Sequence, residues 1–142
     1  MKIEEILRRK GHDVVTITES HSVLEAVQVL VSHNIGGLVV AEGSHPTGIL
    51  TERDILRLTA RSPGELGSIQ VGAVMTRELI TATPEDRVPD MMDVMTQNKI
   101  RHLPVMEGER LIGIISIGDL VNACRVSAEE ENSQLRHYIQ GA

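Results

Sequence analysis

Gly48-Ile-Leu-Thr-Glu-Arg-Asp54 and Gly113-Ile-Ile-Ser-Ile-Gly-Asp119 are two copies of one pattern, and this pattern decides the fold. Each copy reads glycine, two apolar residues, a hydroxyl residue, two variable residues and aspartate. The copies lie 65 residues apart, and the same offset aligns 14–57 with 79–122 without a gap, giving 12 identities over 44 positions. A repeat of this length indicates a duplicated structural unit. Two units are too few for a solenoid, so we expect them to pack face to face about a pseudo-two-fold axis and to enclose two related clefts.

Hydrophobic periodicity predicts the same β-α-β-β-α order in each unit, so the expected fold class is α+β. The elements expected in the first unit lie at 14–18, 22–33, 38–41, 48–51 and from 54 onward. Those expected in the second unit lie at 80–83, 87–98, 103–106, 111–116 and 119–124. A leading helix over 2–10 and a short helical turn over 71–76 complete the prediction.

This order divides the chain into five segments. They are an N-terminal helix (1–11), repeat 1 (12–60), a linker (61–76), repeat 2 (77–126) and a C-terminal helix or tail (127–142). The tail is charged enough to form a solvated helix, on which Leu135, Tyr138 and Ile139 give an apolar stripe suited to a partner chain.

The composition excludes several classes of protein. A formal charge of −6 and a pI near 5.5 argue against nucleic-acid binding, which needs a basic surface. A single cysteine permits no internal disulfide, which is typical of a reducing cytoplasm. The chain begins without the apolar run of a signal peptide, and no stretch approaches the ~18 apolar residues that span a membrane. Tyr138 is the only aromatic residue among Phe, Trp and Tyr, so aliphatic side chains must form the core and hold any bound ring.

The chain carries no motif typical of catalysis, phosphate loops or metal binding. Its six histidines, at 12, 21, 33, 45, 102 and 137, show no metal-ligand spacing. Asp54 with Arg53 and Asp119 with His102 are only loose candidates for an acid–base pair. We therefore expect no metal site and no enzymatic activity.

The repeated polar motif has two interpretations. In the first, Thr51 and Ser116 are helix N-caps, and Asp54 and Asp119 reach back to the cap amides, as in a capping box. In the second, each carboxylate also accepts both hydroxyls of a ribose while the helix N-terminus faces a phosphate. The residues alone favour neither strongly, although both copies keep aspartate where other caps would serve.

These motifs resemble those of a tandem pair of cystathionine-β-synthase (CBS) domains, also called a Bateman module. The resemblance covers roughly residues 12–125 and includes Asn98-Lys-Ile-Arg-His-Leu-Pro-Val105, Asn34-Ile-Gly-Gly-Leu-Val-Val40 and Val74-Met75-Thr76. It is strongest with small stand-alone bacterial proteins of this family. It implies two β-α-β-β-α units packed through their sheets, assembly into a homodimer, and binding of AMP, ADP, ATP, NAD(H) or S-adenosylmethionine.

The resemblance also implies the site residues, with each cleft built from both repeats. One cleft would contain Asp119 and Ser116, with Arg101 and His102 nearby and Thr16 and Thr18 from repeat 1. The other would contain Asp54, Thr51 and Arg53, with Gly36 and Gly37 nearby and Thr81, Thr83 and Pro84 from repeat 2. Ile35 and Ile100 would flank the purine. Because Gly36-Gly37 aligns with Arg101-His102, the clefts should differ, and we expect the Asp54 cleft to be the occupied one if only one is.

The sequence thus predicts a non-catalytic sensor. It would be a cytoplasmic homodimer that requires no cofactor and binds AMP, ADP, ATP or NAD(H) between its repeats. The alternative is a structural or partner-binding dimer with empty clefts, in which the two aspartates act only as helix caps. Neither interpretation involves nucleic acid or a membrane.

Overall fold

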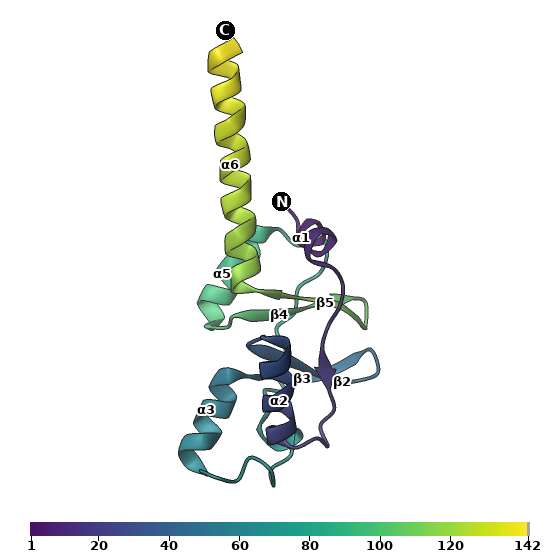
Figure 1. The fold of residues 1–142 in the computed structure, drawn as a ribbon. Coiled ribbons are helices and arrows are strands. Elements are labelled where there is room, and N and C mark those ends of the chain that lie inside the picture. Colours follow the sequence, from purple (N-terminus) through teal and green to yellow (C-terminus); the bar gives the residue numbers. More distant parts are fainter. Residues whose placement is uncertain (142) are drawn as a thin grey trace.

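The computed structural model describes residues 1–141 as two similar halves, with one long helix projecting from the second half (Figure 1). Repeat 1 comprises β1 (Thr16–Ile17), α2 (Val23–His33), β2 (Gly37–Glu42), β3 (His45–Thr51) and α3 (Glu52–Arg61). Repeat 2 comprises α5 (Val88–Asn98), β4 (His102–Glu107), β5 (Arg110–Ser116) and α6 (Ile117–Gly141). The short helices α1 (Ile3–Lys10) and α4 (Val71–Val74) precede the two repeats. The predicted α+β fold of two related units is confirmed.

The two β-hairpins are equivalent in register. Gly37 pairs with Thr51 in repeat 1, and His102 pairs with Ser116 in repeat 2. Each hairpin is irregular at the same point, after Val40 and after Val105. The strands β3 and β5 contact each other, so the repeats meet through their sheets. The duplication therefore extends to the local backbone.

The first strand of each unit is shorter than predicted. In repeat 1 the strand expected at 14–18 is reduced to β1, which runs parallel to β2. In repeat 2 the strand expected at 80–83 is reduced to a single parallel bridge between Ala82 and Val105. In repeat 1, Thr16 of β1 pairs with Val39, whereas the residue equivalent to Val39 in repeat 2 is Pro104. Proline has no backbone N–H to donate, so the ladder cannot extend past it.

Each leading helix packs on the repeat that it does not precede. The amide of Ile3 at the start of α1 donates to the carbonyl of Asp86 in repeat 2, at 2.9 Å. In the equivalent contact, the amide of Val71 at the start of α4 donates to the carbonyl of His21 in repeat 1, at 2.8 Å. This exchange ties the two repeats together through the chain itself.

Two aliphatic cores follow from this exchange. The core of repeat 1 contains Ile17, Ala26, Leu30, Leu38, Val40, Leu50, Val71 and Met75. The core of repeat 2 contains Ile3, Ile6, Leu7, Ala82, Val88, Met91, Met95, Leu103, Val105, Ile115, Leu120 and Ala123. As the composition predicts, neither core contains an aromatic side chain.

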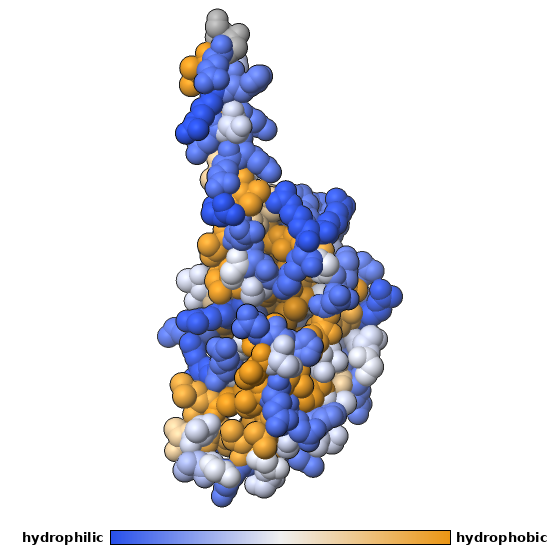
Figure 2. Space-filling view, in the orientation of Figure 1, coloured by the Kyte–Doolittle hydropathy of each residue, from blue (hydrophilic) through white to orange (hydrophobic). Residues whose placement is uncertain are grey.

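The helix α6 leaves the body of the molecule. It begins in repeat 2 and continues without a break through the tail, whereas the sequence predicted a separate helix there. Figure 2 shows mostly hydrophilic side chains on its projecting part, as expected for a solvated helix, with hydrophobic ones near the tip. None of the helices within residues 1–141 is long and apolar enough to cross a membrane.

Close contact between α4 and β3 makes Gly48 sensitive to substitution. A Cβ at this position would lie 2.6 Å from Met75 Sδ and 2.9 Å from the Thr76 carbonyl oxygen. We expect Gly48→Ala to lower the free energy of unfolding by about 1–3 kcal/mol, as overpacking does, in urea denaturation. Gly67→Ala is the matched control, because its Cβ would meet Leu24 at an ordinary 3.7 Å. Equal stability of the two variants would contradict the tight packing.

Candidate functional site

Both copies of the repeated motif form a capping arrangement. In repeat 1 the amide of Asp54 donates to Thr51 Oγ1 at 3.4 Å, and the amide of Thr51 donates to Asp54 Oδ2 at 3.0 Å. In repeat 2 the amide of Asp119 donates to Ser116 Oγ at 3.2 Å, and the amide of Ser116 donates to Asp119 Oδ2 at 2.8 Å. The predicted capping interpretation is therefore confirmed in both copies. The contacts of both carboxylates engage Oδ2, that of Asp54 with Thr51 and that of Asp119 with Ser116.

A cavity of about 540 Å³ lies between the repeats, next to Asp54. Repeat 1 contributes Gly36, Ile49, Thr51, Glu52, Arg53, Asp54, Leu56 and Arg57. The segment before repeat 2 and repeat 2 itself contribute Thr76, Glu78, Leu79, Ile80, Asn98, Lys99, Ile100, Arg101, His102 and Pro104. We call this cavity the Asp54 cleft.

The lining of the Asp54 cleft combines charged and aliphatic groups. Its cationic side chains are Arg53, Arg57, Lys99 and Arg101, and its acidic ones are Glu52, Asp54 and Glu78. Its apolar part includes Ile80, Ile100 and Pro104. Cations near a helix N-terminus suit an anionic group, while the aliphatic wall suits a flat apolar ring.

His102 enters this cleft against the backbone of repeat 1. A Cβ on Gly37 would lie 2.9 Å from the His102 ring, so only glycine leaves room for it. Similarly, a Cβ on Gly36 would lie 3.2 Å from the carboxylate of Glu52. Burial, partly offset by the charge of Glu52, holds the pKa of His102 below its ordinary value. The imidazole is therefore neutral near pH 7.

Several predicted site residues are brought together as expected, and others need correction. Arg101 and His102 lie beside the Ser116–Asp119 cap, as predicted, since His102 pairs with Ser116 and the carbonyl of Arg101 accepts from the amide of Ile117 at 2.8 Å. Both also line the Asp54 cleft, which was not predicted. Thr81, Thr83 and Pro84 do not line it; their place is taken by the preceding residues, Leu79 and Ile80.

A local contact explains why Thr83 lies outside the lining of the Asp54 cleft. Its amide donates to Asp86 Oδ2 at 2.7 Å, which closes the turn that leads into α5. Gly37 and Ile35 also lie outside the lining: Gly37 is buried under His102, and Ile35 packs against the core of repeat 1.

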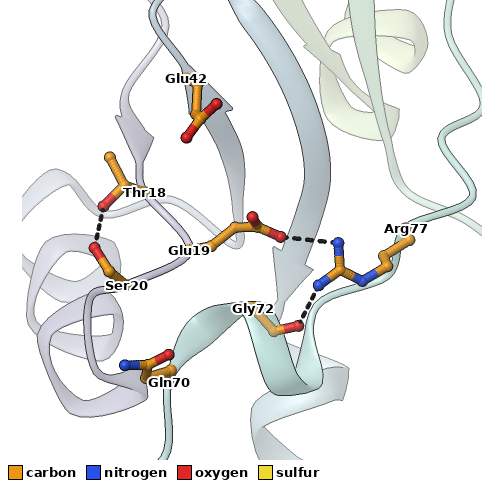
Figure 3. Close-up of a pocket in the computed structure, with 7 residues that line it drawn as sticks. All are labelled: Thr18, Glu19, Ser20, Glu42, Gln70, Gly72 and Arg77. Carbon is orange, nitrogen blue, oxygen red and sulfur yellow. Dashed lines mark hydrogen bonds and ion pairs between the residues drawn. The ribbon is translucent and has the colours of Figure 1, made fainter.

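Thr16 and Thr18 line other cavities. Both contribute to a cavity of about 530 Å³ along α2, and Thr18 also lines one of about 340 Å³, shown in Figure 3. In that second cavity Arg77 pairs with Glu19 at 2.8 Å and donates to the carbonyl of Gly72 at 2.9 Å. Neither cavity is lined by Asp119 or Ser116. The predicted grouping of Thr16 and Thr18 with Asp119 is therefore not seen.

Asp119 instead contacts the leading helix. Lys10 Nζ donates to Asp119 Oδ2 at 2.7 Å and to the carbonyl of Ile114 at 2.8 Å. Burial raises the pKa of Asp119, but the hydrogen bonds from Lys10 and Ser116 outweigh it and hold the pKa below its ordinary value of 3.8. The duplication in the sequence does not point to Lys10, because the aligned repeats start at Val14 and leave α1 out.

The depressed pKa of Asp119 predicts a pH-dependent contribution to stability. The ionised carboxylate stabilises the folded state above the unfolded pKa, and this contribution is lost as pH falls through the folded pKa. We expect Asp119→Asn to be less stable than the wild type near neutrality, with a difference that shrinks below about pH 3.8. Urea denaturation across a pH series measures it. A difference that stays constant with pH would contradict the ion pair.

Within residues 1–141, no group of three or more His, Cys, Asp or Glu side chains is arranged to hold a metal ion.

Comparison with known proteins identifies the family. The model of the CBS domain matches residues 3–61 and 71–126, so the chain belongs to the CBS domain family as a tandem pair. Both matches include the leading helices, α1 and α4. The mitochondrial CBS domain-containing protein CBSX3 of Arabidopsis thaliana is 39% identical over an alignment of 148 positions, which covers 98% of this chain and 72% of that protein.

Solved structures show the same fold. A CBS-domain containing protein from Agrobacterium tumefaciens is 37% identical, with a TM-score of 0.84 over 87% of this chain and 98% of that one. A CBS domain protein from Pyrobaculum aerophilum, complexed with AMP, is 25% identical, with a TM-score of 0.75 over 84% and 89%. The CBS domain pair of protein MJ0100, in complex with 5-methylthioadenosine and S-adenosyl-L-methionine, is 26% identical, with a TM-score of 0.77 over 87% and 98%.

Proposed function

We propose that this chain is a non-catalytic regulatory module that binds a phosphorylated adenosine compound in the Asp54 cleft. The observation that carries the proposal is the cleft itself, in which three carboxylates, four cations and an aliphatic wall surround about 540 Å³. Solved relatives complexed with AMP, or with 5-methylthioadenosine and S-adenosyl-L-methionine, support an adenosine ligand. AMP, ADP, ATP and NAD(H) are the candidates.

Asp54 is assigned to the ribose. Its Oδ2 is engaged by Thr51, whose amide and hydroxyl lie 3.0 and 3.2 Å away, and this fixes the carboxylate at the start of α3. A fixed carboxylate with a remaining acceptor is suited to the two hydroxyls of a ribose. Such a charge-assisted contact contributes about 1.5–3 kcal/mol.

The four cations are assigned to phosphate. Arg53 and Arg57 come from the first turns of α3, and Lys99 and Arg101 come from the segment that links α5 to β4. Cations from both repeats would thus converge on one anionic group. A phosphorylated ligand is favoured over S-adenosylmethionine, because the sulfonium cation would meet the same positive groups.

The adenine is assigned to the aliphatic wall. Ile80, Ile100 and Pro104 supply apolar surface from repeat 2, in agreement with the predicted contact of Ile100. Neutral His102 lies beside them and adds a polar edge without a charge.

A second candidate function is the binding of a protein partner. On the projecting part of α6, the predicted stripe is open to solvent, with Leu135, Tyr138 and Ile139 exposed by 59%, 77% and 71%. Their spacing of three and four residues places them on one face of α6, and an exposed apolar face favours a contact surface over a purely solvated helix. The homodimer and the cytoplasmic location remain parts of the proposal that the sequence suggested.

Thermal unfolding with AMP, ADP, ATP, NAD, NADH and S-adenosylmethionine tests the nucleotide proposal. A ligand at ~100 times its dissociation constant adds about 2.7 kcal/mol. We expect a rise in Tm of about 5–11 °C with at least one phosphorylated compound, and a smaller rise with S-adenosylmethionine. No shift with any compound, on protein freed of carried-over nucleotide, would favour the partner-binding function.

Asp54→Ala should weaken the binding of that nucleotide by about 10- to 150-fold in isothermal titration calorimetry, because the ribose contact is lost. Asp93→Ala is the matched control, since Asp93 is an exposed aspartate on α5 outside the cleft. Equal affinities of the two variants would show that the nucleotide binds elsewhere.

A further inference from the structure

The two aspartates of the repeated motif occupy equivalent positions but have different neighbours. Asp54 opens onto a cavity between the repeats. Asp119 is 2.7 Å from Lys10 Nζ and is held in an ion pair with it. Besides the Gly37–His102 contact, the ion pair of Lys10 is thus a second feature that makes the two related sites different.

Lys10 reaches Asp119 because α1 is longer than α4. Leu7 packs over Gly113 in the same way that Met75 packs over Gly48, so these residues mark equivalent points of the two helices. After Met75 the chain leaves the helical path, and Thr76 pairs with β3. After Leu7 the helix continues for three more residues and places Lys10 over the end of β5. Repeat 1 has no counterpart of this extra turn.

The contact is built on a fixed support. Helix α1 is anchored by Ile3 and Leu7, which are 0% and 1% exposed in the core of repeat 2. Lys10 Nζ also donates to the carbonyl of Ile114 at 2.8 Å, so two acceptors fix the ammonium. The side chains of Lys10 and Asp119 are 35% and 24% exposed, which limits screening by water. Because the backbone of Lys10 is fixed by α1 and its ammonium by two acceptors, this ion pair differs from a mobile one on the surface.

We propose that Lys10 is an internal occupant of the Asp119 site, so that each chain binds one adenosine ligand, in the Asp54 cleft, and not two. Lys10 Nζ shares Asp119 Oδ2 with the Ser116 amide, so a ribose at Asp119 would meet a carboxylate whose charge is already balanced by the ammonium. Lys10 therefore determines which of the two related sites takes a ligand. The site count rests on the proposed function, whereas the Lys10–Asp119 contact does not.

Calorimetric titration of the full chain with AMP and, separately, with ATP measures the site count. We expect one site per chain in the wild type and two in Lys10→Met, which keeps the aliphatic stem but removes the charge. Lys10→Arg should retain one site, because the charge is restored. Lys10→Met combined with Asp119→Asn should return to one site. Two sites in the wild type, or one in Lys10→Met, would overturn the proposal.

A measurement without ligand distinguishes failure of this inference from failure of the proposed function. The titration of the Asp119 carboxyl, followed by ¹³C NMR, should move to higher pH in Lys10→Met. Lys2→Met is the matched control, because Lys2 pairs with exposed Glu85 at the other end of α1 and should leave Asp119 unchanged. An unmoved Asp119 titration in Lys10→Met would overturn the contact. If no variant binds either nucleotide while the titration moves, the proposed function fails and the contact stands.

Discussion

A residue that touches its own symmetry equivalent lies on the symmetry axis, and only one of the two can carry a bulky side chain there. Gly37 and His102 are such a pair: they are 65 positions apart, and the imidazole fills the space that a Cβ on Gly37 would need. Because position 37 is a glycine, β2 and β4 can approach closely at this point. The contact also makes perfect symmetry impossible, and it directs Arg101 and His102 toward the cleft that contains Asp54.

The exchange of leading helices is the second consequence of the duplication. Because α1 completes the core of repeat 2 and α4 completes that of repeat 1, neither repeat has its full core without residues from beyond its own boundaries. The cleft between the repeats is thus framed by elements whose relative position is fixed by burial, typically worth about 1.5–3 kcal/mol for each large aliphatic side chain. A binding site formed between two parts gains preorganisation when those parts are held in this way.

The sequence predicted the features that depend on local pattern. It did not predict the features that depend on contacts between residues far apart in the chain. Periodicity and caps located both hairpins and the main helices, and the repeated motif correctly identified Thr51 and Asp54 as a capping pair. The strand expected at 80–83 failed because Pro104, on the neighbouring strand, removes a donor. Lys10 could not be found from the motif, since its partner Asp119 lies 109 residues away. The alignment of Gly36-Gly37 with Arg101-His102 predicted that the two clefts differ, but the direct contact between Gly37 and His102 could be seen only in the structure.

The helix that starts at the Ser116–Asp119 cap is long enough to amplify a change of angle at its first turn. With 25 residues at ~1.5 Å per residue, α6 is about 37 Å long, and most of it extends beyond the body of the molecule (Figure 1). Its first turn carries Asp119, and Arg9 of α1 contacts Glu130 further along at 3.8 Å. A tilt of ~10° at the first turn would move the tip by roughly 6 Å at this length. The length of α6 therefore converts a small change of angle at the Ser116–Asp119 cap into a displacement the size of a side chain at the far end.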